Sequence, residues 1–211
     1  MSLILQSLRH YWKGHLGLLF GAFLSSAILS GSLVIGDSVR ASLKRVSELR
    51  LGKIQSGLVG GDRWFTEALA TKAAAAPLIQ MSGSASVANG TARANGIQVL
   101  GVNDEFWKLS PSGKLIAIAD DELALNEPLA RKLNVKPGDT IIVRVEKPSA
   151  ISRDAPLSGS TNEQVTLRRK IARIVNAEDF GAFQLTASQR TPDTIFLPRR
   201  ELQRQLEKDS M

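Results

Sequence analysis

The chain has 211 residues, no cysteine, two histidines and a formal net charge of +7. The lack of cysteine excludes a disulfide framework and thiolate chemistry, and a hydrophobic content of 43% excludes a disordered chain. Residues 1–52 carry six Lys or Arg against two Asp or Glu, and the other residues carry the remaining 21 against 18. The basic excess therefore surrounds an apolar segment, which favours contact with membrane lipid and argues against nucleic acid as a partner.

That apolar segment, residues 14–36, contains no charged residue unless His15 is protonated. As a helix it would be about 34 Å long, enough to cross a hydrocarbon core of about 30 Å. We predict a transmembrane helix preceded by a cytoplasmic or interfacial N-terminus, residues 1–13, in which Tyr11 and Trp12 suit the membrane interface. A cleaved signal peptide is the alternative, disfavoured by the length of the apolar region. Counting Lys and Arg on each side does not decide the orientation.

Small residues recur at four-residue spacing along the predicted span. Gly17, Gly21 and Ser25 form one row, which predicts close packing against other membrane helices. The alternative is that small residues are common in any membrane helix.

Residues 37–52 are predicted to continue the same helix as an amphipathic stalk. Val39, Leu43 and Val46 recur every three to four positions, which predicts an apolar stripe for a following domain to pack on. We expect Gly52 to end this helix.

The remaining residues, 53–211, are predicted to form one extracytoplasmic domain. The first half is expected to hold a strand over 54–59, a helix over 64–76, a long hairpin over 77–102 with a type I′ turn at Asn89-Gly90, and a short helical segment over 103–109. A strand over 122–126, a helix over 127–134, a turn over 136–139 and a strand over 140–145 are expected next. An exposed loop over 147–163, strands over 165–175 and 194–197, and a helix over 199–208 complete the domain. Alternation along 165–175 places Val165, Leu167, Arg169, Ile171, Arg173 and Val175 on one face. The fold class is therefore α+β: one long N-terminal transmembrane helix followed by a mixed α/β extracytoplasmic domain with β-hairpins.

Residues typical of catalytic or metal sites are scarce. Both histidines, His10 and His15, lie beside the predicted span, so the domain lacks the usual general base and the common soft metal ligands. We therefore predict no catalytic, cofactor-binding or metal-binding residue, and a protein that is not an enzyme.

Three charged or turn motifs allow two interpretations each. A solvated turn at Asp120-Asp121-Glu122 is favoured over a hard-cation site. At Gly138-Asp139, a turn that begins a buried strand is favoured over a catalytic carboxylate. For Arg168-Arg169-Lys170 with Arg173, a solvated strand face is favoured over a surface for an anionic partner.

Several motifs resemble, in their order, the N-terminal region of FtsX/MacB-like ABC transporter permeases. They are Ser7-Leu8-Arg9-His10-Tyr11-Trp12-Lys13, Gly36-Asp37-Ser38-Val39-Arg40-Ala41-Ser42-Leu43, Gly61-Asp62-Arg63-Trp64-Phe65, residues 125–140 beginning Leu125-Asn126-Glu127-Pro128, and Phe180-Gly181-Ala182-Phe183-Gln184-Leu185. Such permeases have four or more membrane helices and an extracytoplasmic core domain between the first and second. A cytoplasmic ATPase drives the helices, and the outer domain moves lipoproteins, peptides or drugs, or activates a wall hydrolase.

The resemblance implies that the chain is the first membrane helix plus part of a MacB-like core domain, inactive by itself. It implies a bacterial inner membrane location, a cytoplasmic N-terminus and residues 37–211 outside the cytoplasm. The implied partners are membrane lipid, the remaining permease helices or a second permease subunit, and a cytoplasmic ABC ATPase subunit. It supplies no catalytic residue and no cofactor. The alternatives are a single-pass membrane-anchored periplasmic module that binds a ligand or protein, and an extracytoplasmic hydrolase that uses paired carboxylates.

Overall fold

The structure, a computed structural model, describes residues 10–60, 65–146, 164–186, 188 and 190–206. The chain divides into two units, Met1–Val46 and Ser47–Met211. The described part of the first unit is helical, and the second unit contains every strand that the structure describes. The division falls inside the predicted stalk, 37–52. The assignment of 1–13, 14–36, 37–52 and 53–211 to particular compartments stays a prediction.

One helix, α2 (Trp12–Leu51), contains both the predicted span and the predicted stalk. Its 40 residues make it about 60 Å long. It is long and apolar enough to cross a membrane, judged by length and composition alone. The expectation of a single helix that ends at Gly52 is confirmed. Gly52 has φ +53°, and its N–H donates to the carbonyl oxygen of Glu48 at 2.8 Å.

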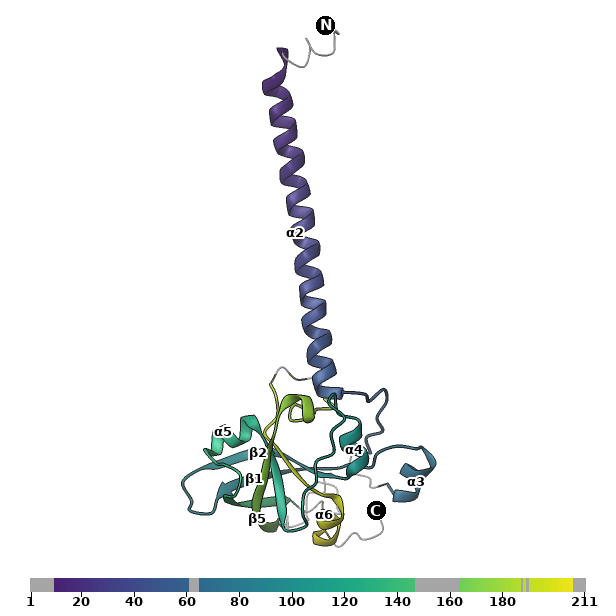
Figure 1. Ribbon diagram of the computed structural model, residues 1–211, viewed down its shortest axis with the longest axis vertical. Helices are drawn as coiled ribbons and strands as arrows, with labels where there is room; N and C mark the ends of the chain where they lie inside the picture. The colour runs from purple at the N-terminus through teal and green to yellow at the C-terminus, as the bar shows by residue number, and fades with distance from the viewer. Residues whose placement is uncertain (1–9, 61–64, 147–163, 187, 189, 207–211) are drawn as a thin grey trace, which may run out of the picture. The chain divides into compact units, whose positions relative to one another are not determined.

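Six strands of the second unit close into a barrel in the order β1-β2-β6-β3-β5-β4 (Figure 1). Their bounds are β1 (Ile79–Val87), β2 (Arg93–Val102), β3 (Glu122–Asn126), β4 (Thr140–Glu146), β5 (Gln164–Val175) and β6 (Thr194–Pro198). The β2–β6 and β3–β5 pairs are parallel, and the other four pairs are antiparallel. The predicted mixed α/β character is confirmed, whereas closure into a barrel was not predicted.

Aliphatic side chains from all six strands fill the barrel interior. They include Met81, Ala85, Ile97, Val99, Leu123, Leu125, Val143, Val145, Leu167, Ile171, Ile195 and Leu197, all of them buried. Two helices complete this core: α5 (Glu127–Leu133) follows β3, and α6 (Arg199–Gln205) follows β6. Because β3 and β6 are antiparallel, these helices leave from opposite ends of the barrel. Leu129 and Leu133 of α5 and Leu202 of α6 pack onto the interior cluster from the two ends.

Asn126 joins β3 to α5 and is fully buried. Its Oδ1 accepts from the backbone N–H of Leu129 at 3.2 Å, which caps α5, and from that of Thr194 at 3.0 Å. Its Nδ2 donates to the carbonyl oxygens of Gly181 at 2.8 Å and Pro192 at 2.7 Å. All four hydrogen-bonding positions of the amide are therefore used, and one side chain ties β3, α5, β6 and the segment around Gly181 together.

A second apolar cluster covers the outside of β2, β6 and β3. Leu100, Val102, Ala124 and Phe196 face outward from these strands and are buried. Phe106 and Trp107 of α4 (Asp104–Lys108) pack on them. Phe180 and Phe183, which follow the short 3₁₀ helix η1 (Ala177–Asp179), join the same cluster. The barrel thus has one wall whose outer face is buried beneath aromatic side chains.

An extra residue in β5 interrupts its alternation. Leu123 of β3 pairs with Ile171, but the next residue, Ala124, pairs with Arg173, so Ala172 has no partner on β3. This is a β-bulge, which inverts the order of inward and outward residues beyond it. The predicted face is confirmed from Val165 to Ile171, and its continuation to Arg173 and Val175 is wrong for this reason. Ile174, not Arg173, packs against the interior cluster, and Val175 belongs to the outer one.

Three other expectations differ from the structure. Residues 54–59 form no strand: Ile54 packs on the outer cluster, whereas Leu58 and Val59 are exposed. The helix expected over 64–76 is the shorter α3 (Glu67–Lys72), followed by the exposed residues 73–75, which have no packing to sustain another turn; its expected start at residue 64 lies outside the described residues. The β1–β2 turn is not type I′, since Gly90 has a positive φ and Asn89 does not.

The remaining elements agree with expectation. The hairpin over 77–102 is confirmed, β3 has the predicted bounds, and α4, α5, β4, β5 and β6 lie within one or two residues of theirs. The final helix begins at Arg199 as predicted, although its predicted end at residue 208 lies outside the described residues. So does the predicted loop over 147–163.

Candidate functional site

The surface of α2 carries the residues predicted to pack against other helices. Residues 12–48 of this helix are all exposed, and no residue of α2 is buried. A Cβ placed on Gly17 or Gly21 meets no atom within 4 Å. Nothing in the described chain therefore requires glycine at these positions, and packing of Gly17, Gly21 and Ser25 on another helix stays a prediction.

The predicted stalk residues are exposed as well. Val39, Leu43 and Val46 are 52%, 65% and 41% exposed. They belong to the first unit, and their packing on a domain stays a prediction.

The end of α2 is joined to the outer aromatic cluster. The N–H of Lys53 donates to the carbonyl oxygen of Leu109 at 2.8 Å, and the Arg50 guanidinium donates to the carbonyl oxygen of Ser188. A Cβ on Gly52 would overlap the Leu109 carbonyl oxygen and lie 2.8 Å from Cε1 of Phe180. Gly52 is thus required both by its positive φ and by the approach of these two groups.

Aromatic rings make up the cluster at this junction. The ring centroid of Phe106 lies 4.8 Å from that of Phe180 and 5.1 Å from that of Phe183, the latter pair edge to face. Trp107 lies 5.1 Å from Phe196 of β6. Ile54, which follows the end of α2 closely in sequence, packs on the same group. Because rings in offset and edge-to-face contact bury large areas, this cluster is a rigid seat for the chain that leaves α2.

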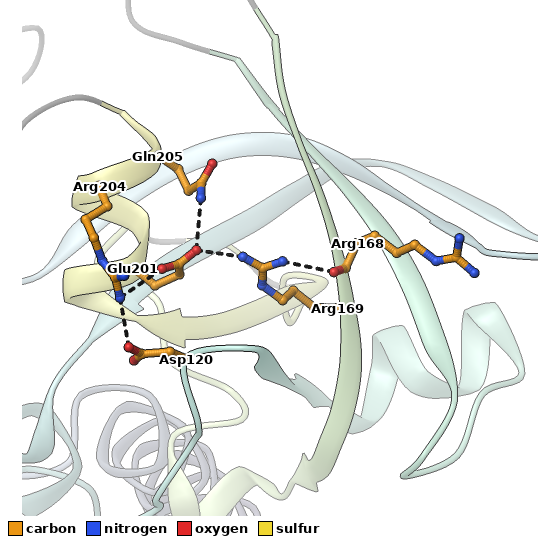
Figure 2. A network of polar contacts seen from close by, with 6 residues as sticks. All are labelled: Asp120, Arg168, Arg169, Glu201, Arg204 and Gln205. Carbon is orange, nitrogen blue, oxygen red and sulfur yellow. Dashed lines mark hydrogen bonds and ion pairs between the residues drawn. The ribbon is translucent and has the colours of Figure 1, made fainter.

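A network of charged side chains lies where α6 meets β5 (Figure 2). Glu201 of α6 is at its centre, with only 6% of its side chain exposed. Its Oε1 accepts from Arg169 Nη2 at 2.6 Å and from Gln205 Nε2 at 3.0 Å, and its Oε2 lies 3.0 Å from Arg204 Nη2. Arg204 also pairs with Asp120 at 2.8 Å.

This network links three segments that are distant in sequence: the loop before β3, strand β5 and helix α6. A buried ion pair costs desolvation energy, which further hydrogen bonds offset. Glu201 has three such partners, whereas Nε of Arg169 is buried without an acceptor among the described residues. The network holds α6 against the barrel, and its charged side chains bind one another.

A second ion pair holds the first turn of α6. Arg199, 7% exposed, donates to Oε1 of Glu67 in α3 at 2.5 Å. Together with Glu201, it fixes both α3 and β5 to the helix that fills one end of the barrel.

The motifs considered for chemistry have structural roles. Asp120 is engaged by Arg204, and the described residues hold no group of three or more potential metal ligands. Gly138, with φ +98°, lies in the turn before β4, and Asp139 accepts from the N–H of Lys136 at 2.7 Å, as the turn interpretation predicted. A depression of about 460 Å³ beside this turn is lined by residues of the β1–β2 loop and by Leu133, Asn134, Val135, Asp139 and Thr140, with no Lys or Arg among these described lining residues.

The basic run of β5 is divided between its two faces. Arg169 points inward, level with Leu167 and Ile171, and meets Glu201. Arg168, Lys170 and Arg173 are exposed. Sequence reasoning missed the Arg169–Glu201 pair, although an arginine between inward-facing Leu167 and Ile171 was a signal for a buried acidic partner.

No protein-family model matches the chain, and no curated protein matches it. The periplasmic region of MacB from Actinobacillus actinomycetemcomitans, known from a crystal structure, is similar with 12% sequence identity and a TM-score of 0.42. The similarity covers 72% of this chain and 66% of that one, so slightly less than two thirds of the neighbour.

Proposed function

We propose that this chain is a membrane-anchored segment of an FtsX/MacB-like ABC transporter permease, with no enzymatic activity of its own. In this proposal α2 crosses the bacterial inner membrane with its N-terminus in the cytoplasm. Residues 37–211 lie outside the cytoplasm, and a cytoplasmic ABC ATPase supplies the energy for export or for handling lipoproteins or peptides.

The observation that carries this proposal is the continuity of α2. An apolar helix that has no break at Gly36 runs to Leu51, and the next residues are held by the aromatic cluster of the barrel domain. A displacement of the helix end would therefore act directly on Leu109 and Phe180. The ordered motifs that resemble this permease family are further support.

The implied partners follow from the surface of α2. Its large apolar side chains, such as Phe20, Phe23 and Leu33, are exposed, and lipid is a solvent in which such exposure costs nothing. Gly17 and Gly21 leave room for the backbone of another helix, from the rest of the permease or from a second subunit. No nucleic acid is involved in this proposal.

Purification of the full chain from its native membrane, followed by peptide mass spectrometry and an ATP hydrolysis assay, tests this function. We expect an ABC ATPase to co-purify, and Gly21→Ile to reduce its recovery because the added side chain separates the helices. The matched control is Leu19→Ile, which keeps an apolar side chain on the same helix. Wild-type chain that purifies without an ATPase, or equal recovery with Gly21→Ile and with wild type, would contradict the proposal.

Orientation is testable because the chain contains no cysteine. A single Lys72→Cys variant places a thiol on exposed α3. We expect a membrane-impermeant maleimide to label it in cells whose outer membrane has been opened. Labelling only after the inner membrane is broken would reverse the orientation.

A second candidate is a single-pass anchored module that binds a periplasmic ligand or protein. It is favoured by the closure of the barrel, which leaves no unpaired edge among the six described strands and gives the domain a core of its own. Ligand binding by the full chain in the absence of any ATPase would favour this candidate over the first.

A further inference from the structure

The wall of the barrel formed by β4 and β5 is exposed or half-buried on its outer face. Inward residues of β4, such as Ile141, Val143 and Val145, are fully buried. The outward residues that alternate with them are Thr140, Ile142, Arg144, Glu146, Gln164, Thr166, Arg168, Lys170 and, beyond the bulge, Arg173, so this set holds four cations and one carboxylate. We refer to this set as the β4–β5 wall. The aromatic cluster covers β2, β6 and β3 instead, so within the described chain this wall remains open to solvent.

Four cations on this wall have no acidic partner within the part of the chain that the structure describes. Three of them, Arg168, Lys170 and Arg173, are exposed, and the fourth, Arg144, donates to Oγ of Ser86 at 3.4 Å. Arg169 differs sharply, since it lies between Arg168 and Lys170 in sequence and is paired with buried Glu201. Among the described residues, the inward arginine of β5 therefore has an acidic partner and its outward cations have none.

The residues around these cations suit an anion with several charges. Ile142 of β4 is the Cα partner of Arg168, and Thr166 is that of Arg144. Hydroxyl and guanidinium groups donate hydrogen bonds to carboxylates, and cations two residues apart on one strand repeat at about 7 Å. No aromatic residue is among the described outward residues of the wall, so it lacks the stacking groups with which proteins hold single-stranded nucleic acid.

We propose that the β4–β5 wall is a docking surface for an acidic segment of a partner protein. Arg144 lies on β4 and Arg168 on the neighbouring strand β5, so the positive charge is spread over two strands. A polypeptide with several carboxylates reaches the cations of both strands. An acidic partner here is compatible with either candidate function.

The test uses the full chain in nanodiscs of phosphatidylcholine and a fluorescently labelled oligo-glutamate peptide, with binding followed by anisotropy. We expect binding that weakens as ionic strength rises, because exposed charges are screened. The double variant Arg168→Glu/Lys170→Glu reverses two cations of the wall and is expected to weaken binding by about tenfold or more. The neutral pair Arg168→Gln/Lys170→Gln, expected to lose about threefold, serves if the reversed pair does not fold.

The matched control is Lys114→Glu/Lys136→Glu, which makes the same change in net charge at exposed positions outside the wall. It is expected to bind oligo-glutamate within about twofold of wild type. Equal losses in the two charge-reversed variants would assign binding to net charge and overturn the proposal. So would wild-type chain that ignores oligo-glutamate, or that binds phosphatidylglycerol vesicles in its place.

Discussion

Helix α2 and the barrel use the same kinds of apolar side chain in opposite ways. Leu, Ile, Val and Phe of α2 are mostly more than half exposed, whereas those of the barrel interior and the aromatic cluster are almost fully buried. The barrel gains its stability by removing these groups from water. The helix satisfies its backbone internally and leaves its apolar side chains exposed, as a membrane-spanning helix does. The same kinds of side chain therefore form a buried core in one unit and an exposed apolar surface in the other.

The largest effect is expected when one phenyl ring is removed from each of these two regions. Phe106→Ala deletes a ring that contacts Trp107, Phe180 and Phe183, and we expect a loss of about 3–5 kcal/mol in the unfolding free energy of the barrel domain. The melting temperature of the full chain in detergent should fall by roughly 10 °C. Phe23→Ala is the matched control, since Phe23 is 66% exposed on α2. An equal fall in both variants would contradict separate roles for the two regions.

The next largest effect is expected at the residue where the helix gives way to the barrel domain. Gly52→Ala places a methyl group against the Leu109 carbonyl oxygen at φ +53°, and should destabilise the domain by about 2–3 kcal/mol. Gly90→Ala is the matched control, because Gly90 also has a positive φ, +76°, but a Cβ there meets no atom within 4 Å. We expect it to cost about 1 kcal/mol in thermal unfolding of the full chain. If the two variants lost the same unfolding free energy, the close contact between residue 52 and Leu109 would add nothing to the cost of a positive φ.

A smaller effect is expected at the polar contact that fixes α6 to the apolar barrel. Glu201→Ala leaves Arg169 without its acidic partner and should cost about 2 kcal/mol, allowing for the 20% exposure of the Arg169 side chain. The double variant Arg169→Met/Glu201→Leu should recover most of this loss, because no charge is left buried. Denaturant unfolding measures both.

The smallest effect is expected at Asp120, on the exposed side of the same network. This side chain is 68% exposed, so Asp120→Ala should change stability by less than about 0.5 kcal/mol in the same denaturant unfolding. Glu201→Ala that is no more destabilising than Asp120→Ala would show that the buried pair adds nothing to the attachment of α6.

Features of the fold that depend on local sequence pattern could be predicted from the sequence. The sequence pattern predicted the bounds of β3, β4 and β5 to within a residue or two. Asn126-Glu127-Pro128 predicted the start of α5, and Gly52 predicted the end of α2. Barrel closure was not predictable in the same way, because β2–β6 and β3–β5 pair residues far apart in sequence. The apolar run Ile54–Val59 satisfied a strand pattern, but Ile54 packs on the aromatic cluster and Leu58 lies in solvent.

The candidate sites follow the same division. Packing residues Gly17, Gly21, Ser25, Val39, Leu43 and Val46 were chosen from helical periodicity, and α2 is a helix through all of them. The described chain buries none of them, so periodicity alone supports their packing role. The Arg169–Glu201 pair and the close approach of Leu109 and Phe180 to Gly52 depend on contacts between segments that are distant in sequence. A local sequence pattern does not indicate such contacts.

The bulge at Ala172 gives β5 one residue more than its pairing with β3 requires. Replacing Ala172 with another small residue leaves Ile171 and Ile174 facing the interior. Deleting it would remove the bulge and restore plain alternation, with Arg173 still opposite Ala124 and Ile174 still opposite Leu125. A residue inserted elsewhere in β5 would instead turn the side chains beyond it to the other face. Homologous chains should therefore occur with and without a residue at this position, while other changes of length should collect in the connections between strands.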